Sequence, residues 1–441
     1  MATQVEAGPS KKRTITETLE VEVTVEESIK IQKVHPFFAK RIDKAPATAT
    51  GNFQWLPALG PTRSCFHGIN LLPKASRKVA ALDLDGTLIK GDLRNALVNG
   101  KPQWEWWRSF IPEKLKILHE EGYAIVIISN QALKSAALKN WKVKVENIAQ
   151  AMKDIPFRIM AATQKDGFRK PMPGMYRELE RIFQLEGVEI DKSQSFFIGD
   201  AAGRNYPGGK QDFSSTDRKW ALNLGLRFLT PEEYFLKLPA HSNFKLHGIK
   251  VWDLPNVPRV TPTNTPLLLD PPQQEVVLFI GYPCLGKSTF YRQHFQPAGY
   301  VHINQDTLKT REKCVKAVEA AIKERKSCVI DNTNRNAVTR KYYIDACKAQ
   351  KVPIRCFLFA DSIELAWHNN LYRAFNLPAS AAAKEPKRDL LPYTAFVTFR
   401  DNYEEPQSSE GFAEIKRVNW VFEGSEEERR SWSMWLQIDG K

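Results

Sequence analysis

Two short apolar segments constrain the fold most strongly, because each runs directly into a glycine-containing loop. The first is Val79–Leu82, which is followed by Asp83, Leu84, Asp85 and Gly86. The second is Val276–Ile280, which is followed by a glycine-rich loop at 281–286. Buried strands that end in such loops are typical of parallel α/β sheets, whose ligands bind at the carboxyl ends of the strands. The sequence therefore predicts two successive α/β sheets, each with a site at its strand ends.

The chain is long enough for two such sheets. It has 441 residues, more than one hydrophobic core usually serves, so two or three domains are expected. We predict a flexible basic tail at 1–45, a first α/β domain at 46–250, a connector at 251–274 and a second α/β domain at 275–441. The connector carries prolines at 255, 258, 262, 266, 271 and 272, and this density predicts an extended segment without regular structure.

The hydrophobic pattern predicts alternating strands and helices, and hence mainly parallel sheets, in both domains. The elements expected in the first domain are strands Val79–Leu84, Ala124–Ser129, Arg158–Ala162 and Ser195–Gly199, with helices Pro112–Glu121 and Met175–Leu185. The strands expected in the second domain are Val276–Ile280, Tyr300–Ile303, Cys328–Asp331 and Arg355–Phe359.

Charge and cysteine usage narrow the functional classes. The formal net charge of +14 favours a polyanionic partner, above all nucleic acid. The six cysteines form no CxxC pair, so we expect neither a disulfide framework nor a zinc site, and we expect a reducing compartment. No apolar run reaches the ~18 residues of a membrane span, and the polar start predicts no signal peptide. Lys11-Lys12-Arg13 is a candidate nuclear-import signal, and we predict a nuclear location.

Asp83 and Asp85 lie two positions apart at a strand end, so both carboxylates are expected on the same side. A carboxylate in this position can attack phosphorus and form an aspartyl-phosphate. The second carboxylate can protonate the leaving oxygen and later activate water. Because the nucleophile and the phosphate are both anionic, a cation is required, and Mg²⁺ with carboxylate ligands meets that need.

The sequence DLDGT at 83–87 resembles the signature of the haloacid dehalogenase-like phosphatases. Further parts of that pattern follow in order, namely Ser129 in AIVIISNQ, Lys170 in GFRKPMPGMY and Asp200 in SFFIGDAAGR. The resemblance implies a haloacid dehalogenase-like fold with Asp83 as the nucleophile and Asp85 as the general acid and base.

The same resemblance implies how phosphate and metal would be bound. The residues that would bind the phosphoryl oxygens are Thr87, Ser129 and Lys170. The residues that would hold Mg²⁺ are Asp83, Asp200 and, through its backbone carbonyl, Asp85. Asp212 or Asp217 would complete the acidic cluster, and the sequence leaves this choice open.

Residues 281–288, GYPCLGKS, match the pattern G-x-x-x-x-G-K-[ST] and directly follow a predicted strand. The N–H groups of such a loop cradle phosphates, its lysine reaches the β- and γ-phosphates, and its hydroxyl reaches Mg²⁺. The residues expected to bind ATP are Gly281, Gly286, Lys287, Ser288 and Thr289.

A kinase also needs a base for the acceptor hydroxyl, and an aspartate can serve. Asp306 and Asp331 both follow or end predicted strands, so either could be this base. Arg373 is a candidate for the cation that stabilises the transition state.

A phosphatase and a kinase would cancel on the same atom, but they make sense on a polymer with two ends. The blocks DLDGTLI, EGYAIVIISNQ, RKPMPGMY, FIGDAAGR, GYPCLGKST, IDNTN and CFLFADSIELAWHNN are similar to those of the eukaryotic polynucleotide kinase 3′-phosphatases, a family of DNA end-repair enzymes. The resemblance runs from about Phe53 to about Phe422. It implies removal of 3′-phosphates and ATP-dependent phosphorylation of 5′-hydroxyls. The implied roles are kinase base for Asp306, phosphoryl-donor binding for Arg373, and 5′-end binding for Asp331 and Lys313.

The chain departs from the animal members of this family. About 45 residues precede the matching region, too few for their forkhead-associated domain, so we expect a fungal-type member. We also expect the protein to be a monomer. The segment HPFFAKR is a candidate docking peptide for a repair scaffold. Gln305 stands where the animal enzymes have arginine, and Lys309 is a further candidate cation near the 5′ end.

Two other functions remain as alternatives. One is healing of RNA ends, and the other is a fusion of a small-molecule phosphatase with a small-molecule kinase. The tryptophans at 104, 106 and 107 suggest base stacking, but packing before the helix at Pro112 is the preferred interpretation.

Overall fold

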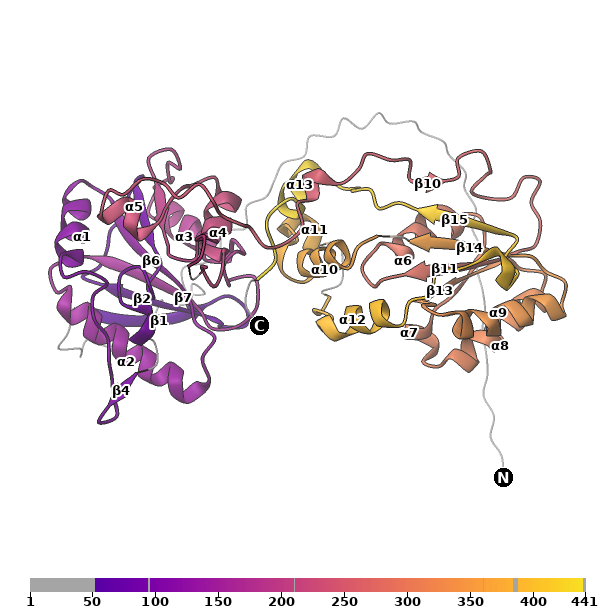
Figure 1. The fold of residues 1–441 in the computed structure, drawn as a ribbon, viewed down its shortest axis with the longest axis horizontal. Coiled ribbons are helices and arrows are strands. Elements are labelled where there is room, and N and C mark those ends of the chain that lie inside the picture. The colour runs from indigo at the N-terminus through magenta and orange to yellow at the C-terminus, as the bar shows by residue number, and fades with distance from the viewer. Residues whose placement is uncertain (1–51, 94–95, 210, 360, 384–387, 439–441) are drawn as a thin grey trace, which may run out of the picture. The chain divides into compact units, whose positions relative to one another are not determined.

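The computed structural model describes residues 52–93, 96–209, 211–359, 361–383 and 388–438 (Figure 1). The tail predicted at 1–45, with the Lys11-Lys12-Arg13 cluster and the HPFFAKR segment, lies outside these residues. None of the helices in the described part is both long and apolar enough to cross a membrane.

The first half of the chain forms a seven-stranded sheet in the order β1-β2-β7-β6-β3-β8-β9. Its strands are β1 Phe53–Leu59, β2 Cys65–Asn70, β3 Val79–Leu82, β6 Ala124–Asn130, β7 Phe157–Ala162, β8 Phe196–Ile198 and β9 Arg227–Leu229. Strand β3 pairs in parallel with both β6 and β8, so the segment that carries Asp83 leaves the middle of the sheet. The β1–β2 hairpin adds an antiparallel edge that the sequence analysis missed.

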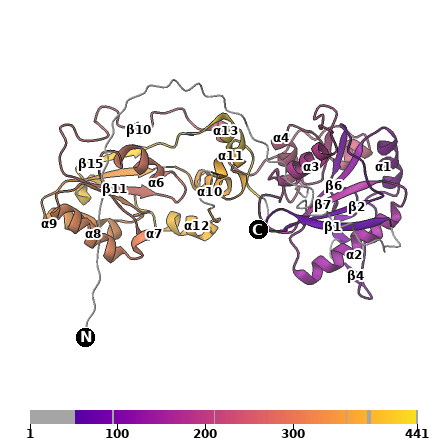
Figure 2. The same ribbon diagram turned by 180° about the vertical axis from the view of Figure 1, so that it is seen from behind.

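Helices cover both faces of this sheet. They are α1 Ile111–Glu120, α2 Ser135–Ala151, α3 Gly174–Leu185, α4 Thr216–Leu224 and α5 Pro231–Phe235. Because successive strand residues point to opposite faces, Ala80 and Leu82 pack with α1 and α2, whereas Val79 and Ala81 pack with α3 and α4 (Figures 1 and 2). Burial on both faces explains why β3 reads as a continuous apolar run.

The tryptophan-rich segment lies beside this core. It follows the short β4–β5 hairpin, Leu97–Val98 with Lys101–Pro102. Trp104, Trp106 and Trp107 are partly buried and pack against the cluster that contains α1 and α2. The preferred packing interpretation is therefore confirmed for these three rings.

The second half forms a six-stranded sheet in the order β10-β15-β14-β11-β13-β12. Its strands are β10 Val260–Thr261, β11 Val276–Gly281, β12 Val301–Ile303, β13 Cys328–Asp331, β14 Ile354–Phe359 and β15 Glu414–Val418. Strand β11 pairs in parallel with β13 and β14, so the glycine-rich loop leaves the middle of this sheet. The strands predicted from the sequence are present in both sheets, with ends shifted by one or two residues at most.

Helices again cover both faces. They are α6 Lys287–Phe290, α7 Gln305–Leu308, α8 Arg311–Lys323, α9 Ala337–Ala349, α10 Ile363–Leu371, α11 Ala379–Ala382, α12 Tyr393–Asp401 and α13 Glu426–Trp432. Buried residues of α8 and α9 pack with Val276 and Leu278 of β11. Val277 and Phe279 pack with α6, α10, α12 and α13 on the opposite face (Figure 2).

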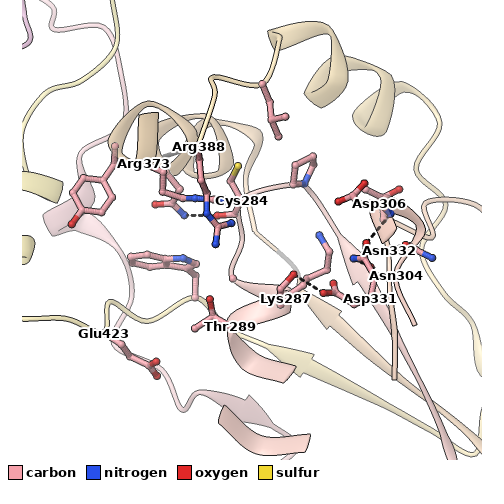
Figure 3. A pocket seen from close by; sticks show the side chains of 18 of the residues that line it. Cys284, Lys287, Thr289, Asn304, Asp306, Asp331, Asn332, Arg373, Arg388 and Glu423 are labelled. Carbon is pink, nitrogen blue, oxygen red and sulfur yellow. Dashed lines mark hydrogen bonds between the residues drawn. The ribbon is translucent and has the colours of Figure 1, made fainter. Parts of the chain in front are cut away.

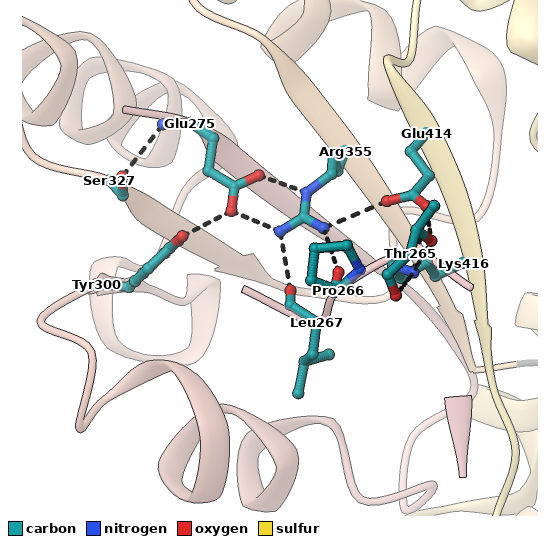
Figure 4. Close-up of polar contacts among 9 residues, drawn as sticks. All are labelled: Thr265, Pro266, Leu267, Glu275, Tyr300, Ser327, Arg355, Glu414 and Lys416. Carbon is teal, nitrogen blue, oxygen red and sulfur yellow. Dashed lines mark hydrogen bonds and ion pairs between the residues drawn. The ribbon is translucent and has the colours of Figure 1, made fainter. Parts of the chain in front are cut away.

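The connector differs from its prediction. Although no regular structure was expected, Val251–Asp253 forms a 3-10 turn and β10 pairs antiparallel with β15. The buried Arg355 of β14 binds Glu275 through two nitrogens and donates to the carbonyls of Pro266 and Leu267 at 3.3 and 2.9 Å (Figure 4). Proline lacks an N–H group but keeps its carbonyl acceptor, so a buried cation can fix a proline-rich segment to the sheet.

We predict that Arg355→Met destabilises the second domain by about 3 kcal/mol, because it leaves the buried Glu275 carboxylate without its cation. Amide hydrogen exchange in β11 and β14, measured with and without urea, reports this loss. The matched control is Arg400→Met, since Arg400 pairs with Asp401 at an exposed position. Equal protection of these strands in the two variants would contradict the proposed stabilisation by the Arg355–Glu275 ion pair.

Candidate active sites

Three carboxylates converge at the end of the first sheet. Asp83 directly follows β3, Asp200 follows β8, and Asp217 lies in the first turn of α4. One oxygen from each lies within 4.8 Å of the others. Of the two aspartates between which the sequence could not decide, Asp217 is therefore the one that lies in the acidic cluster. Asp212 instead pairs with Arg204, whose Nε lies 2.8 Å from its Oδ2 atom.

Two glycines allow the carboxylates to come this close. A Cβ atom on Gly86, which has a φ of +92°, would lie 2.2 Å from Oδ2 of Asp200. A Cβ atom on Gly199 would lie 2.4 Å from Oδ2 of Asp217. Any side chain at either position would force the acidic cluster apart, so glycine is required by close approach.

Lys170 partly neutralises this cluster. Its buried Nζ lies 2.6 Å from Oδ1 of Asp83 and 2.7 Å from Oδ1 of Asp217, and it donates to the carbonyl of Ile128 at 2.9 Å. Asn130 fixes the Lys170 backbone, donating to its carbonyl at 3.1 Å and accepting from its N–H at 2.9 Å. Both anchors come from the end of β6.

The charge balance of the cluster fits a divalent cation. Burial raises the pKa of Asp83 to about 7 despite the neighbouring Lys170. Burial and the charges of Asp83 and Asp217 raise the pKa of Asp200 well above its usual range. One lysine against three carboxylates leaves an excess of negative charge, and oxygen ligands of this kind suit a hard divalent ion.

The remaining predicted phosphatase residues lie around this cluster. Asp85 is buried, and its Oδ2 accepts a hydrogen bond from Nε2 of Gln131 at 2.7 Å. The same Nε2 donates to Oγ of Ser129 at 2.9 Å. Thr87 is buried, and its hydroxyl has no protein partner within the described residues, so it can bind a ligand oxygen. Gln131 was not predicted from the sequence, although its position two residues after Ser129 places the two side chains on the same side of the chain.

The glycine-rich loop connects β11 to α6 in the second sheet. Nζ of Lys287 donates to the carbonyls of Gly281 and Tyr282 at 2.9 and 2.5 Å. Burial lowers the pKa of Lys287 to about 8, with the nearby Asp331 acting in the opposite direction. An anion bound at the loop would favour the charged form of this lysine.

The two candidate bases of the kinase have different surroundings. Asp331 ends β13, is buried, and accepts from Oγ of Ser288 at 2.5 Å and pairs with Nε2 of His302 at 3.0 Å. Burial alone would raise the pKa of Asp331, but the His302 and Ser288 hydrogen bonds hold it below its usual range. Asp306 is exposed at the start of α7, where Asn304 accepts from its backbone N–H at 2.7 Å.

A cavity of about 950 Å³ brings most of the predicted kinase residues together (Figure 3). The predicted residues that line it are Gly286, Lys287, Ser288, Thr289, Asp306, Asp331 and Arg373. Gln305 and Lys309 also line it, and Nζ of Lys309 donates to the carbonyl of Asp306 at 2.6 Å. Arg388, which the sequence analysis did not single out, lies beside Arg373 on the opposite side from Asp306.

Two predicted residues do not line this cavity. Gly281 contributes to the site through its backbone carbonyl, which holds Lys287. Lys313 is exposed on α8, where its backbone N–H is capped by Thr310, and it is absent from the cavity wall. Of the two lysines named for the 5′ end, Lys309 lines the cavity beside Asp306, whereas Lys313 does not.

Known proteins match both halves of the chain. Residues 78–235 match the family described as polynucleotide kinase 3 phosphatase, and residues 276–315 match an AAA domain. With the two mainly parallel sheets, these matches confirm the predicted fold class, a haloacid dehalogenase-like phosphatase domain followed by a P-loop kinase domain.

Three curated proteins are similar in sequence. A bifunctional polynucleotide phosphatase/kinase of Schizosaccharomyces pombe is 35% identical over 82% of this chain and 84% of that protein. A putative bifunctional polynucleotide phosphatase/kinase of Acanthamoeba polyphaga mimivirus is 33% identical over 79% of this chain and 86% of its own length. The polynucleotide 3′-phosphatase ZDP of Arabidopsis thaliana is 34% identical over 36% of this chain and 24% of its own length. The chain thus belongs to the family of bifunctional polynucleotide phosphatase/kinases.

Proposed function

We propose that this protein prepares broken DNA ends for ligation by removing 3′-phosphates and phosphorylating 5′-hydroxyls with ATP. The observation that carries the proposal is the presence of two separate phosphoryl-transfer sites, the Asp83 cluster and the Lys287 loop, in one chain of this family. The names of the relatives support a polynucleotide substrate, and the net charge of +14 favours it.

In the phosphatase reaction, a carboxylate oxygen of Asp83 attacks the 3′-phosphorus and the bond from phosphorus to O3′ breaks. Asp85 gives its proton to O3′, which leaves a 3′-hydroxyl and an aspartyl-phosphate. Asp85 then takes a proton from water, and the water oxygen attacks phosphorus and releases Asp83 and inorganic phosphate. Lys170, Ser129 and Thr87 hold the phosphoryl oxygens.

The residues that would hold Mg²⁺ in this site are Asp83, Asp200, Asp217 and the backbone carbonyl of Asp85. The ion would supply positive charge that keeps Asp83 ionised and reduces its repulsion from the phosphate. Lys170 supplies further positive charge at the same carboxylate, through its contact at 2.6 Å.

In the kinase reaction, Asp306 takes the proton of the 5′-hydroxyl, O5′ attacks the γ-phosphorus, and the bond to the ADP oxygen breaks. The loop N–H groups and Lys287 hold the phosphates of ATP, and Arg373 stabilises their charge. The Ser288 hydroxyl donates to the carboxylate of Asp331, so its oxygen lone pairs would be available to hold a second Mg²⁺, which would supply positive charge beside the phosphates of ATP. The exposure of Asp306 to the cavity favours it over Asp331 as the base.

The proposal extends to the organisation and setting of the chain. Residues 46–250 would be the 3′-phosphatase domain, 251–274 the connector and 275–441 the 5′-kinase domain. The protein would act as a monomer in the nucleus, recruited to DNA breaks by a repair scaffold.

We predict that the two activities are separable. Asp83→Asn removes the nucleophile and lowers the 3′-phosphatase rate on the order of 10³-fold or more, while the 5′-kinase rate stays within about twofold. Lys287→Ala has the converse effect. Both rates are measured on nicked DNA with 3′-phosphate and 5′-hydroxyl ends, in the presence of Mg²⁺ and ATP.

Matched substrates distinguish the alternatives. Nicked and single-stranded RNA test an RNA end-healing function, and sugar phosphates with free sugars test a pair of small-molecule enzymes. A preference for either class over DNA, or loss of both activities in one folded variant, would contradict the proposal.

We predict that Asp217 and Asp212 respond differently to substitution. Asp217→Asn raises the Mg²⁺ concentration for half-maximal thermal stabilisation at least ~10-fold, because a carboxylate leaves the metal cluster. Asp212→Asn, the control, keeps that concentration near its original value, since Asp212 binds Arg204. Identical shifts in the two variants would show that the cluster at 83, 200 and 217 is not the metal site.

A further inference from the structure

Gln131 contacts two residues of the phosphatase site but has no place in the reaction described so far. It directly follows β6, its side chain is buried, and its backbone N–H donates to the carbonyl of Ala162 at 2.7 Å. Its Nε2 donates to Oδ2 of Asp85 at 2.7 Å and to Oγ of Ser129 at 2.9 Å. An amide nitrogen carries two hydrogens, so both of its donors are used on these two groups.

The contact with Asp85 determines where that residue can carry its proton. An amide N–H only donates, so the oxygen that faces it, Oδ2, must offer a lone pair. In this orientation of the amide, a protonated Asp85 carries its proton on Oδ1. A flipped amide would place its carbonyl oxygen against the ionised carboxylate of Asp85, so the donating orientation is also the one that electrostatics favours.

The contact with Ser129 has a parallel consequence. Because the Ser129 hydroxyl accepts the second N–H of Gln131, its own hydrogen must point elsewhere. A serine hydroxyl that accepts from the protein on one side can donate to a phosphoryl oxygen on the other. One buried amide thus fixes the direction of two hydrogens in the site.

We propose that Gln131 is a positioning residue of the phosphatase, which keeps the acidic proton on Oδ1 of Asp85 and turns the Ser129 hydroxyl toward the phosphoryl group. The proposal rests on the proposed function, since that function makes Asp85 the acid. In the first chemical step Asp83 bonds to phosphorus, the bond to O3′ breaks, and the Oδ1 proton of Asp85 moves to O3′.

Substrates with different leaving groups test this role. A 3′-phosphate oligonucleotide releases an alkoxide, which needs the proton of Asp85, whereas p-nitrophenyl phosphate releases a phenolate that departs without it. The value of kcat/KM reports substrate binding and formation of the aspartyl-phosphate but not its hydrolysis, because formation is the first irreversible step. For Gln131→Ala we expect kcat/KM to fall ~10²-fold with the oligonucleotide and at least ~10-fold less with p-nitrophenyl phosphate.

Three further variants complete the experiment. Asp85→Asn should show the same selectivity to a greater degree, whereas Ser129→Ala should slow both substrates by similar factors. Gln131→Met keeps the length of the side chain and removes both donors, so it tests the role if the alanine variant does not fold. Amide hydrogen exchange in β3 and β6 of each preparation reports that the phosphatase domain is folded.

The possible outcomes distinguish a wrong role for Gln131 from a wrong proposed function. If the unaltered protein hydrolyses both substrates and the Gln131 variants slow them equally, or slow neither, the role of Gln131 is wrong and the proposed function stands. If the unaltered protein does not hydrolyse the oligonucleotide, the proposed function is wrong and the role of Gln131 is wrong with it.

Discussion

The gathering of three carboxylates around one lysine is the constraint on which the phosphatase half depends. Burial is the main cause of the raised pKa values of Asp83 and Asp200, and repulsion between the carboxylates raises them further. The sheet holds the acids together in spite of it, because Asp83 and Asp200 follow neighbouring parallel strands and Gly86 and Gly199 leave room. The protein thereby stores a local excess of negative charge that a divalent cation can neutralise.

The kinase half buries a charge of the opposite sign. There the buried group is a cation, Lys287, whose pKa burial lowers to about 8, and loop carbonyls hold its ammonium group. The polyphosphate of ATP would bring the anionic charge, much as a metal ion would bring the cationic charge to the Asp83 cluster. Since one site is short of positive charge and the other is short of negative charge, the two reactions need separate pockets.

Much of both sites could be predicted from the sequence, because each motif follows a buried parallel strand. The resemblance to the haloacid dehalogenase-like phosphatases assigned Asp83, Ser129 and Asp200 to one site, and such residues can meet because the ends of parallel strands lie at one edge of a sheet. The choice between Asp212 and Asp217 could not be made, because it depends on which way a loop folds back onto α4. The prediction that the connector has no regular structure was wrong for a similar reason. Its fixation depends on Arg355, which lies in a distant strand and binds backbone carbonyls that any sequence would provide.

The end of β6 shows why these groups can be placed so closely. Four consecutive residues from Ile128 to Gln131 each contribute one contact or functional group. The Ile128 carbonyl and the Asn130 side chain hold Lys170, Ser129 offers its hydroxyl, and Gln131 binds Asp85. Because β6 lies between β3 and β7, paired on both sides and buried, its end cannot shift without breaking both ladders. A slip of one residue would reverse the direction of the Ser129, Asn130 and Gln131 side chains and of the Ile128 carbonyl, so the register of a central strand aligns the nucleophile, its acid and the phosphoryl-binding residues together.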